Sequence, residues 1–119
     1  MATVDDVRPL ALSLERSTEV FVRDRRKFRV GQIVYLALSR DETIMGFAFP
    51  KEERDALVGG QPEKFLMPAP GDLRFNWVLA RLAALDPAEA RELVVDAWRI
   101  VVPKKLWRAY DEAHPEGPG

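Results

Sequence analysis

The densest group of side chains suited to chemistry is a run of bases between residues 16 and 40. The same segment holds two acids, Glu19 and Asp24, so its charge is 7 − 2 = +5, whereas the whole chain carries −1. Arginine and lysine at this density suit phosphate groups, and contacts to phosphates position a nucleic acid without reading its sequence. The seven bases are Arg16, Arg23, Arg25, Arg26, Lys27, Arg29 and Arg40.

These bases coincide with a predicted β-hairpin. Residues 19–23 are rich in β-branched and aromatic side chains, and residues 27–30 alternate charged and apolar ones, as a half-buried strand does. We predict the turn at residues 24–26, which places Arg25, Arg26 and Lys27 at the tip of the hairpin. The candidate nucleic-acid contacts on this hairpin are Arg23, Arg25, Arg26, Lys27 and Arg29.

A solvated hairpin offers a second explanation for the same charge, because lysine and arginine also protect the edge of a sheet from pairing with another chain. A smaller basic group, Lys104, Lys105 and Arg108, follows a long predicted helix. The negative end of that helix dipole accounts for this group. We retain Lys104 and Lys105 as additional candidate contacts to DNA.

The tryptophans raise a related question. Trp77 and Arg81 share one face of a predicted strand, where they are able to clamp a strand of nucleic acid. A tryptophan at such a position is more often packed beneath a helix, and we favour that explanation. Trp98 is predicted in the core, whereas Trp107 is the aromatic residue expected to be exposed.

Residue types for catalysis or metal binding are scarce. The chain has no cysteine, and its single histidine, His114, lies near the C-terminal end, where we expect fraying. The pairs Asp5-Asp6 and Glu52-Glu53 fit the first turns of helices, where the helix dipole favours acids. Gly59-Gly60 lacks the lysine of a phosphate-binding loop. We therefore expect no catalytic site, no metal site and no cofactor.

The elements that position these residues follow from periodicity and turn signals. Residues 18–50 predict three or four antiparallel strands. One of them contains Gly46, whose lack of a side chain leaves space for a close neighbour. Further strands are predicted at 64–67 and 75–82. Four helices are predicted. The first covers residues 3–14 and contains Pro9, and the second covers residues 50–57 and is ended by Gly59-Gly60. The third covers residues 86–102, and the fourth runs from Pro103 onward.

The long helix has the strongest local signal. Asp86 suits the N-cap, Pro87 suits the first helical position, and Glu89 is able to reach back to the cap. An apolar stripe follows at helical spacing and predicts the surface that covers the sheet. The stripe consists of Ala90, Leu93, Val94, Ala97, Trp98 and Val101.

This order of elements predicts an α+β fold, in which a mainly antiparallel sheet of five to six strands carries helices on one face. We expect a single domain at residues 1–113 and a frayed tail at residues 114–119. The N-terminus lacks the apolar segment of a signal peptide, and the longest apolar run, residues 33–38, is too short to cross a bilayer. The absence of cysteine fits a cytoplasmic location.

Several weak motifs in a consistent order resemble the MmcQ/YjbR family of small bacterial proteins. The resemblance implies a CyaY-like, YjbR-like fold and DNA binding through a double-wing surface, and it brings no established enzymatic activity. Residues 13–17 depart from it, because they lack the Leu-Pro step of many members. The motifs are the Thr-Val-Asp-Asp-Val-Arg start, Phe28-Arg29-Val30-Gly31, Lys51-Glu52-Glu53-Arg54, residues 79–86, Ala97-Trp98-Arg99, Val102-Pro103-Lys104-Lys105-Leu106 and Ala109-Tyr110-Asp111.

CyaY-type proteins also bind iron on an acidic first helix. Here that helix offers only Asp5, Asp6 and Glu15, which are too few for us to expect iron binding in this protein. We therefore predict a small, non-enzymatic domain that binds DNA through the basic hairpin. Because the pI of the chain is near 5.9, only a local basic patch, and not the whole surface, is expected to contact DNA. The alternative is a protein-interaction module that uses Trp107 and the loop at residues 68–72.

Overall fold

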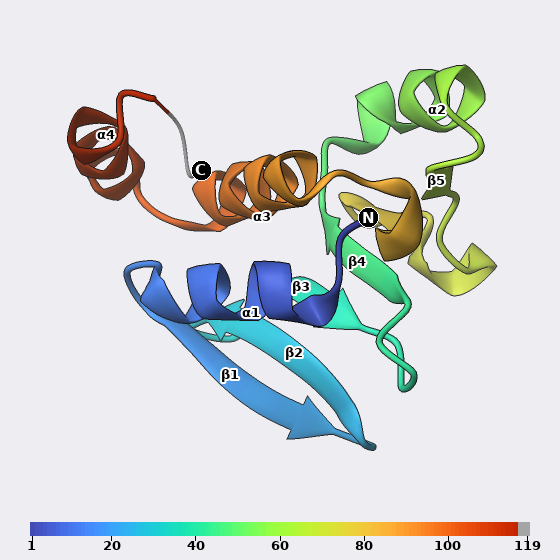
Figure 1. Ribbon diagram of the computed structural model, residues 1–119, viewed down its shortest axis with the longest axis horizontal. Helices are drawn as coiled ribbons and strands as arrows, with labels where there is room; N and C mark the ends of the chain where they lie inside the picture. The colour runs from blue at the N-terminus through green and yellow to red at the C-terminus, as the bar shows by residue number, and fades with distance from the viewer. Residues whose placement is uncertain (117–119) are drawn as a thin grey trace.

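Short turns join the first four strands, and each strand pairs with the next in antiparallel direction. The computed structural model describes residues 1–116. Its strands are β1 (Ser17–Val22), β2 (Arg25–Val30), β3 (Ile33–Leu38), β4 (Ile44–Ala48), β5 (Phe65–Leu66) and β6 (Trp77–Arg81). They form one antiparallel sheet in the order β1-β2-β3-β4-β6-β5, so β6 lies between β4 and the short edge strand β5 (Figure 1).

The helices of the described chain are α1 (Val4–Ser13), α2 (Lys51–Gly60), α3 (Pro87–Val101) and α4 (Lys104–Ala113). Helices α1 and α3 pack against each other and cover one face of the sheet, while α2 contacts β5 and β6 (Figure 1). An edge-to-face contact between Trp98 and Tyr110, with ring centroids 5.5 Å apart, and an ion pair between Arg99 and Asp111 hold α4 beside α3. The predicted α+β fold with an antiparallel sheet is confirmed.

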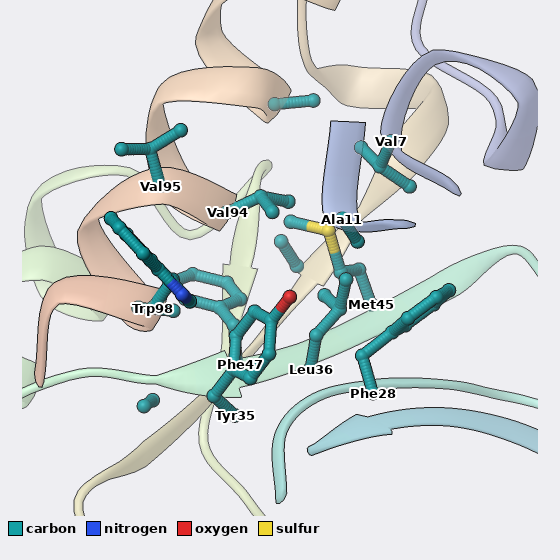
Figure 2. Packing of buried hydrophobic residues seen from close by; sticks show 14 of the residues in the cluster. Val7, Ala11, Phe28, Tyr35, Leu36, Met45, Phe47, Val94, Val95 and Trp98 are labelled. Carbon is teal, nitrogen blue, oxygen red and sulfur yellow. The ribbon is translucent and has the colours of Figure 1, made fainter. Parts of the chain in front are cut away.

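The core lies between the sheet and the helices α1 and α3. Side chains alternate along each strand, so every second residue points toward the helices. Phe28, Leu36 and Phe47 of the sheet belong to the same core as Val94 and Trp98 of α3, and all five are almost fully buried (Figure 2). The opposite face of the sheet is not covered by α1 or α3, although the end of α3 reaches its margin, and we call it the open face.

A bulge in β3 places two consecutive side chains on the helix side. The register between β2 and β3 shifts after Phe28, and Tyr35 is buried together with Leu36. The hydroxyl oxygen of Tyr35 lies 2.7 Å from Oγ of Ser17, and burial raises the pKa of Tyr35 to about 12. This bulge changes which later side chains of β3 reach the open face.

The turn of the first hairpin differs from the prediction. Val22 pairs with Arg25, so a two-residue turn of Arg23 and Asp24 joins β1 to β2, with φ of 52° and 65°. Two-residue turns with positive φ match the twist of the flanking strands, and this match outweighs the usual preference of arginine for negative φ. Placing Arg25, Arg26 and Lys27 at the tip was therefore wrong, because all three are residues of β2.

The helix signals are confirmed in part. Pro9 lies inside α1, and Asp86 and Pro87 begin α3 as N-cap and first helical residue. Glu89 does not reach back to the cap; its carboxylate instead accepts a hydrogen bond from Nζ of Lys64 at 3.2 Å. The long-range ion pair replaces the predicted local contact, because Lys64 lies beside the start of α3.

The buried side of α3 is rotated from the predicted stripe. Val95 is buried, whereas Leu93 and Val101 are only partly buried against the core. Helix α2 also extends through both Gly59 and Gly60, so this glycine pair lies within the helix rather than ending it after residue 57. Fraying of the tail stays a prediction; residues 117–119 of that tail lie outside the described residues.

Candidate functional site

A groove of about 800 Å³ crosses the open face of the sheet. Its floor is apolar and comes from the central strands, with Ala37 of β3, Gly46 of β4 and Leu79 of β6. Arg25 and Lys27 of β2 form one rim. The loop before β6, including Phe75, and the end of α3 close the groove on other sides.

The rim belongs to a row of three bases on β2. Arg25, Lys27 and Arg29 are alternate residues, so their side chains share the open face and repeat about every 7 Å along the strand. The buried Phe28 shows that the other set of β2 residues faces the helices. None of the three basic side chains is ion-paired within residues 1–116. We call Arg25, Lys27 and Arg29 the β2 row.

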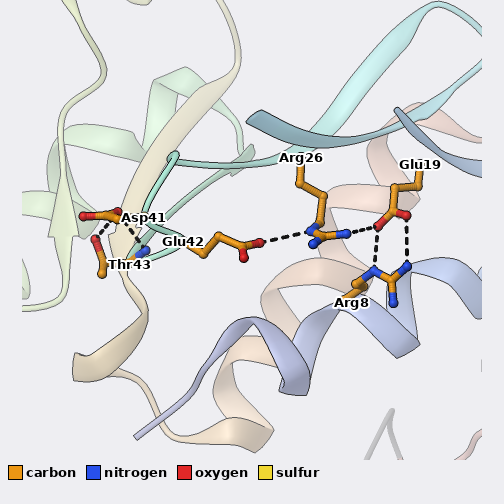
Figure 3. A network of polar contacts seen from close by, with 6 residues as sticks. All are labelled: Arg8, Glu19, Arg26, Asp41, Glu42 and Thr43. Atoms are coloured by element: carbon orange, nitrogen blue, oxygen red, sulfur yellow. Dashed lines mark hydrogen bonds and ion pairs between the residues drawn. The ribbon is translucent and has the colours of Figure 1, made fainter. Parts of the chain in front are cut away.

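Arg26 points the other way and is engaged in a polar network. Its guanidinium donates to Glu19 at 2.8 Å and to Glu42 at 3.0 Å, and Glu19 also receives two hydrogen bonds from Arg8 of α1 (Figure 3). The hydrogen bond from Arg8, assisted by the one from Arg26, holds the pKa of the Glu19 carboxyl below its ordinary value. Arg26 thus ties the hairpin to α1, and its charge is already neutralised by carboxylates.

Glu19→Gln is expected to reduce stability in a pH-dependent way. A carboxyl whose pKa is lower in the folded state stabilises above its ordinary value of 4.5 and loses that contribution as the pH falls through the folded value. At pH 7 the variant should lose about 1–2 kcal/mol of unfolding free energy, and at pH 3 the difference from the parent should shrink.

Urea denaturation at the two pH values measures this difference. Asp24→Asn is the matched control, since Asp24 is an exposed turn residue that makes no ion pair within residues 1–116. Equal effects of the two substitutions at pH 7, or a constant gap between Glu19→Gln and the parent at both pH values, would contradict the role given to the network.

Trp77 lies on the open face and not beneath a helix, so the favoured explanation of this residue was wrong. It is partly exposed and lines the groove. Its indole passes over Gly46 so closely that a Cβ built on this glycine would lie 2.7 Å from the ring, which confirms the predicted space for a close neighbour. Arg81 does not join Trp77 in the groove, because its guanidinium donates to the carbonyl oxygens of Pro62 and Glu63.

A buried arginine supports the wall of the groove. Arg54 of α2 is 6% exposed and donates to the backbone carbonyls of Leu73, Phe75 and Trp77 at 2.8–3.0 Å. These three bonds hold the loop before β6 against α2. This role was not predicted from the sequence, because Arg54 lies in a charged helical segment that is typical of a solvated surface.

The remaining candidates lie elsewhere. Lys104 and Lys105 lie in the first turn of α4, where the dipole of that helix does not favour positive charge. They do not line the groove. Trp107, expected to be exposed, is partly buried against the core, whereas Phe21 and Phe75 are the aromatic residues with exposed fractions of 62% and 49%.

Residues 1–116 contain neither a metal-ligating cluster nor a helix able to span a membrane. This part of the chain contains no group of three or more histidine, cysteine, aspartate or glutamate side chains that could hold a metal ion. None of its helices combines the length and apolarity needed to cross a bilayer.

A search of curated proteins found no match. The crystal structure of Deinococcus radiodurans protein DR2400, which carries the family-model domain DUF419, is similar with a TM-score of 0.74 and 21% identity. The alignment covers 95% of this chain and 88% of that chain and supports the same fold. Residues 12–100 match the family YjbR, and because this segment is most of the chain, the protein belongs to the YjbR family.

Proposed function

We propose that this protein is a non-enzymatic domain that binds DNA through contacts of the β2 row with phosphates. The observation that carries the proposal is the arrangement of Arg25, Lys27 and Arg29 on one solvent-facing side of one strand, without ion-pair partners in residues 1–116. Arg23, at the exposed turn, extends the same basic surface. Arg26 is left out of the proposed contacts, since two carboxylates neutralise it.

Counterion release gives the proposal a measurable signature. Each phosphate that a base neutralises changes the slope of log affinity against log salt by about one unit. The triple variant Arg25→Ala/Lys27→Ala/Arg29→Ala should therefore flatten the slope by about three units and weaken binding to unrelated duplexes alike. Fluorescence anisotropy with labelled duplex DNA across a salt series measures both effects.

The second basic group supplies a matched control. Lys104→Ala/Lys105→Ala/Arg108→Ala removes the same three positive charges from α4. Its slope should stay close to that of the parent if the β2 row is the contact surface. Equal flattening by both variants would indicate an effect of net charge alone, and absence of parent binding to both duplex and single-stranded DNA at low salt would refute DNA binding.

A protein partner is the second candidate. Met67, Leu73 and Phe75 are exposed at 38%, 39% and 49% around the loop before β6, so this segment presents apolar side chains to solvent, as interaction sites do. This observation favours an interaction surface at the loop rather than at Trp107. Failure of the DNA experiment would leave this candidate as the proposed function.

A further inference from the structure

We infer that the nucleic acid bound by this protein is single-stranded and that its bases enter the groove on the open face, where Trp77 provides a stacking surface. The inference rests on the proposed function, because the phosphates of that strand are the ones held by the β2 row. Arg25, Lys27 and Trp77 line the same groove, so one ligand is able to contact both the rim and the aromatic residue.

The dimensions of the sheet fit such a ligand. Three strand spacings separate β2 from β6, a distance of about 14 Å across the open face. The β2 row repeats about every 7 Å, a spacing that suits successive phosphates of an extended single strand. A strand that follows β2 is therefore able to direct its bases across β3 and β4 toward Trp77.

The chemistry of the floor distinguishes a single strand from a duplex. Ala37 and Leu79 present apolar surface beside the basic rim and Trp77. A duplex keeps the faces of its bases stacked inside and would bring phosphates and sugars onto this apolar floor. An unpaired base has an apolar face that matches the floor and stacks on an aromatic ring, as in proteins that bind single strands.

Trp77 is held in position before any ligand arrives. Its indole rests over Gly46, and its backbone carbonyl accepts a hydrogen bond from the buried Arg54 at 3.0 Å. Phe75, two residues earlier, is exposed at the margin of the same groove and is covered on one face by the guanidinium of Arg74, 4.7 Å from the ring centroid. A second stacking position thus lies beside the first.

The test compares one labelled single-stranded oligonucleotide of 12 thymines with its duplex at a fixed low salt concentration. The parent should bind the single strand at least about tenfold more tightly than the duplex. Trp77→Leu should lose about tenfold in affinity for the single strand, the typical effect of removing one stacked aromatic residue, while its salt slope and its duplex affinity stay unchanged. Trp107→Leu is the matched control on α4 and should bind like the parent.

Two measurements keep the test decisive if Trp77→Leu unfolds. Trp77→Phe retains an aromatic ring and should show a smaller loss of affinity for the single strand. Binding of the single strand should also quench the tryptophan fluorescence of the parent and of Trp107→Leu, since Trp98 is buried and Trp77 is the remaining emitter that the ligand can reach.

The outcomes separate the two proposals. Equal or tighter binding of the duplex, together with no effect at Trp77, would overturn the single-strand inference and leave phosphate binding by the β2 row intact. No binding of either oligonucleotide would overturn both. Tighter single-strand binding that survives in Trp77→Phe but falls in Trp77→Leu would support the inference.

Discussion

Replacing Trp98 with alanine is expected to lower the free energy of unfolding by about 3–5 kcal/mol. The side chain is 1% exposed and lies where α3 meets the sheet (Figure 2). Its indole nitrogen donates to the backbone carbonyl of Glu15 at 2.9 Å, and its ring contacts Tyr110 of α4 edge to face. One truncation therefore removes buried apolar surface, leaves a cavity and leaves the carbonyl of Glu15 without this donor.

Urea denaturation followed by circular dichroism measures the loss. Ile100→Ala, on the same helix but 46% exposed, is the control and should change stability by at most about 0.5 kcal/mol. Trp98→Phe should fall between the two, because it keeps a ring and loses the donor. A Trp98→Ala midpoint equal to that of Ile100→Ala would mean that the placement of α3 against the sheet is incorrect.

Replacing Arg54 with methionine is expected to cost about 2–4 kcal/mol, since three carbonyls that now accept from a buried cation would lose their donors. Methionine keeps much of the apolar stem of the side chain, so the loss reports mainly on the hydrogen bonds. The amides of residues 73–77 should exchange with solvent faster in the variant, because Arg54 is what fastens this loop to α2.

Arg81→Met is the matched control for this experiment. Arg81 also donates to backbone carbonyls, of Pro62 and Glu63, but it is exposed, so water replaces its bonds and the loss should stay below about 1 kcal/mol. If Arg54→Met were as stable as Arg81→Met and amide hydrogen exchange at residues 73–77 were unchanged, the hydrogen bonds of the Arg54 guanidinium would not be what holds the loop against α2.

Local patterns in the sequence were sufficient for the strands, the helices and the family resemblance. Alternation in β2, the Asp86-Pro87 start of α3 and the small Gly46 in β4 act over a few residues, and backbone hydrogen bonding makes their consequences predictable. The turn of the first hairpin was predicted at residues 24–26 but consists of Arg23 and Asp24, because the charge of the segment does not reveal the geometric preference for a two-residue turn.

The candidate site depended on contacts between distant segments. The identity of the bases on β2 does not reveal that Arg26 pairs with Glu19 and Glu42 on the helix side of the sheet. Nor does it reveal that Arg25 and Lys27, on the open face, form no ion pair within residues 1–116. Burial of Arg54 likewise depends on a loop about twenty residues away in the chain. The packing of α1 and α3 decides which face of the sheet is covered. The hydrophobic effect depends on the total apolar area that is buried, so it acts between segments that are far apart in the sequence.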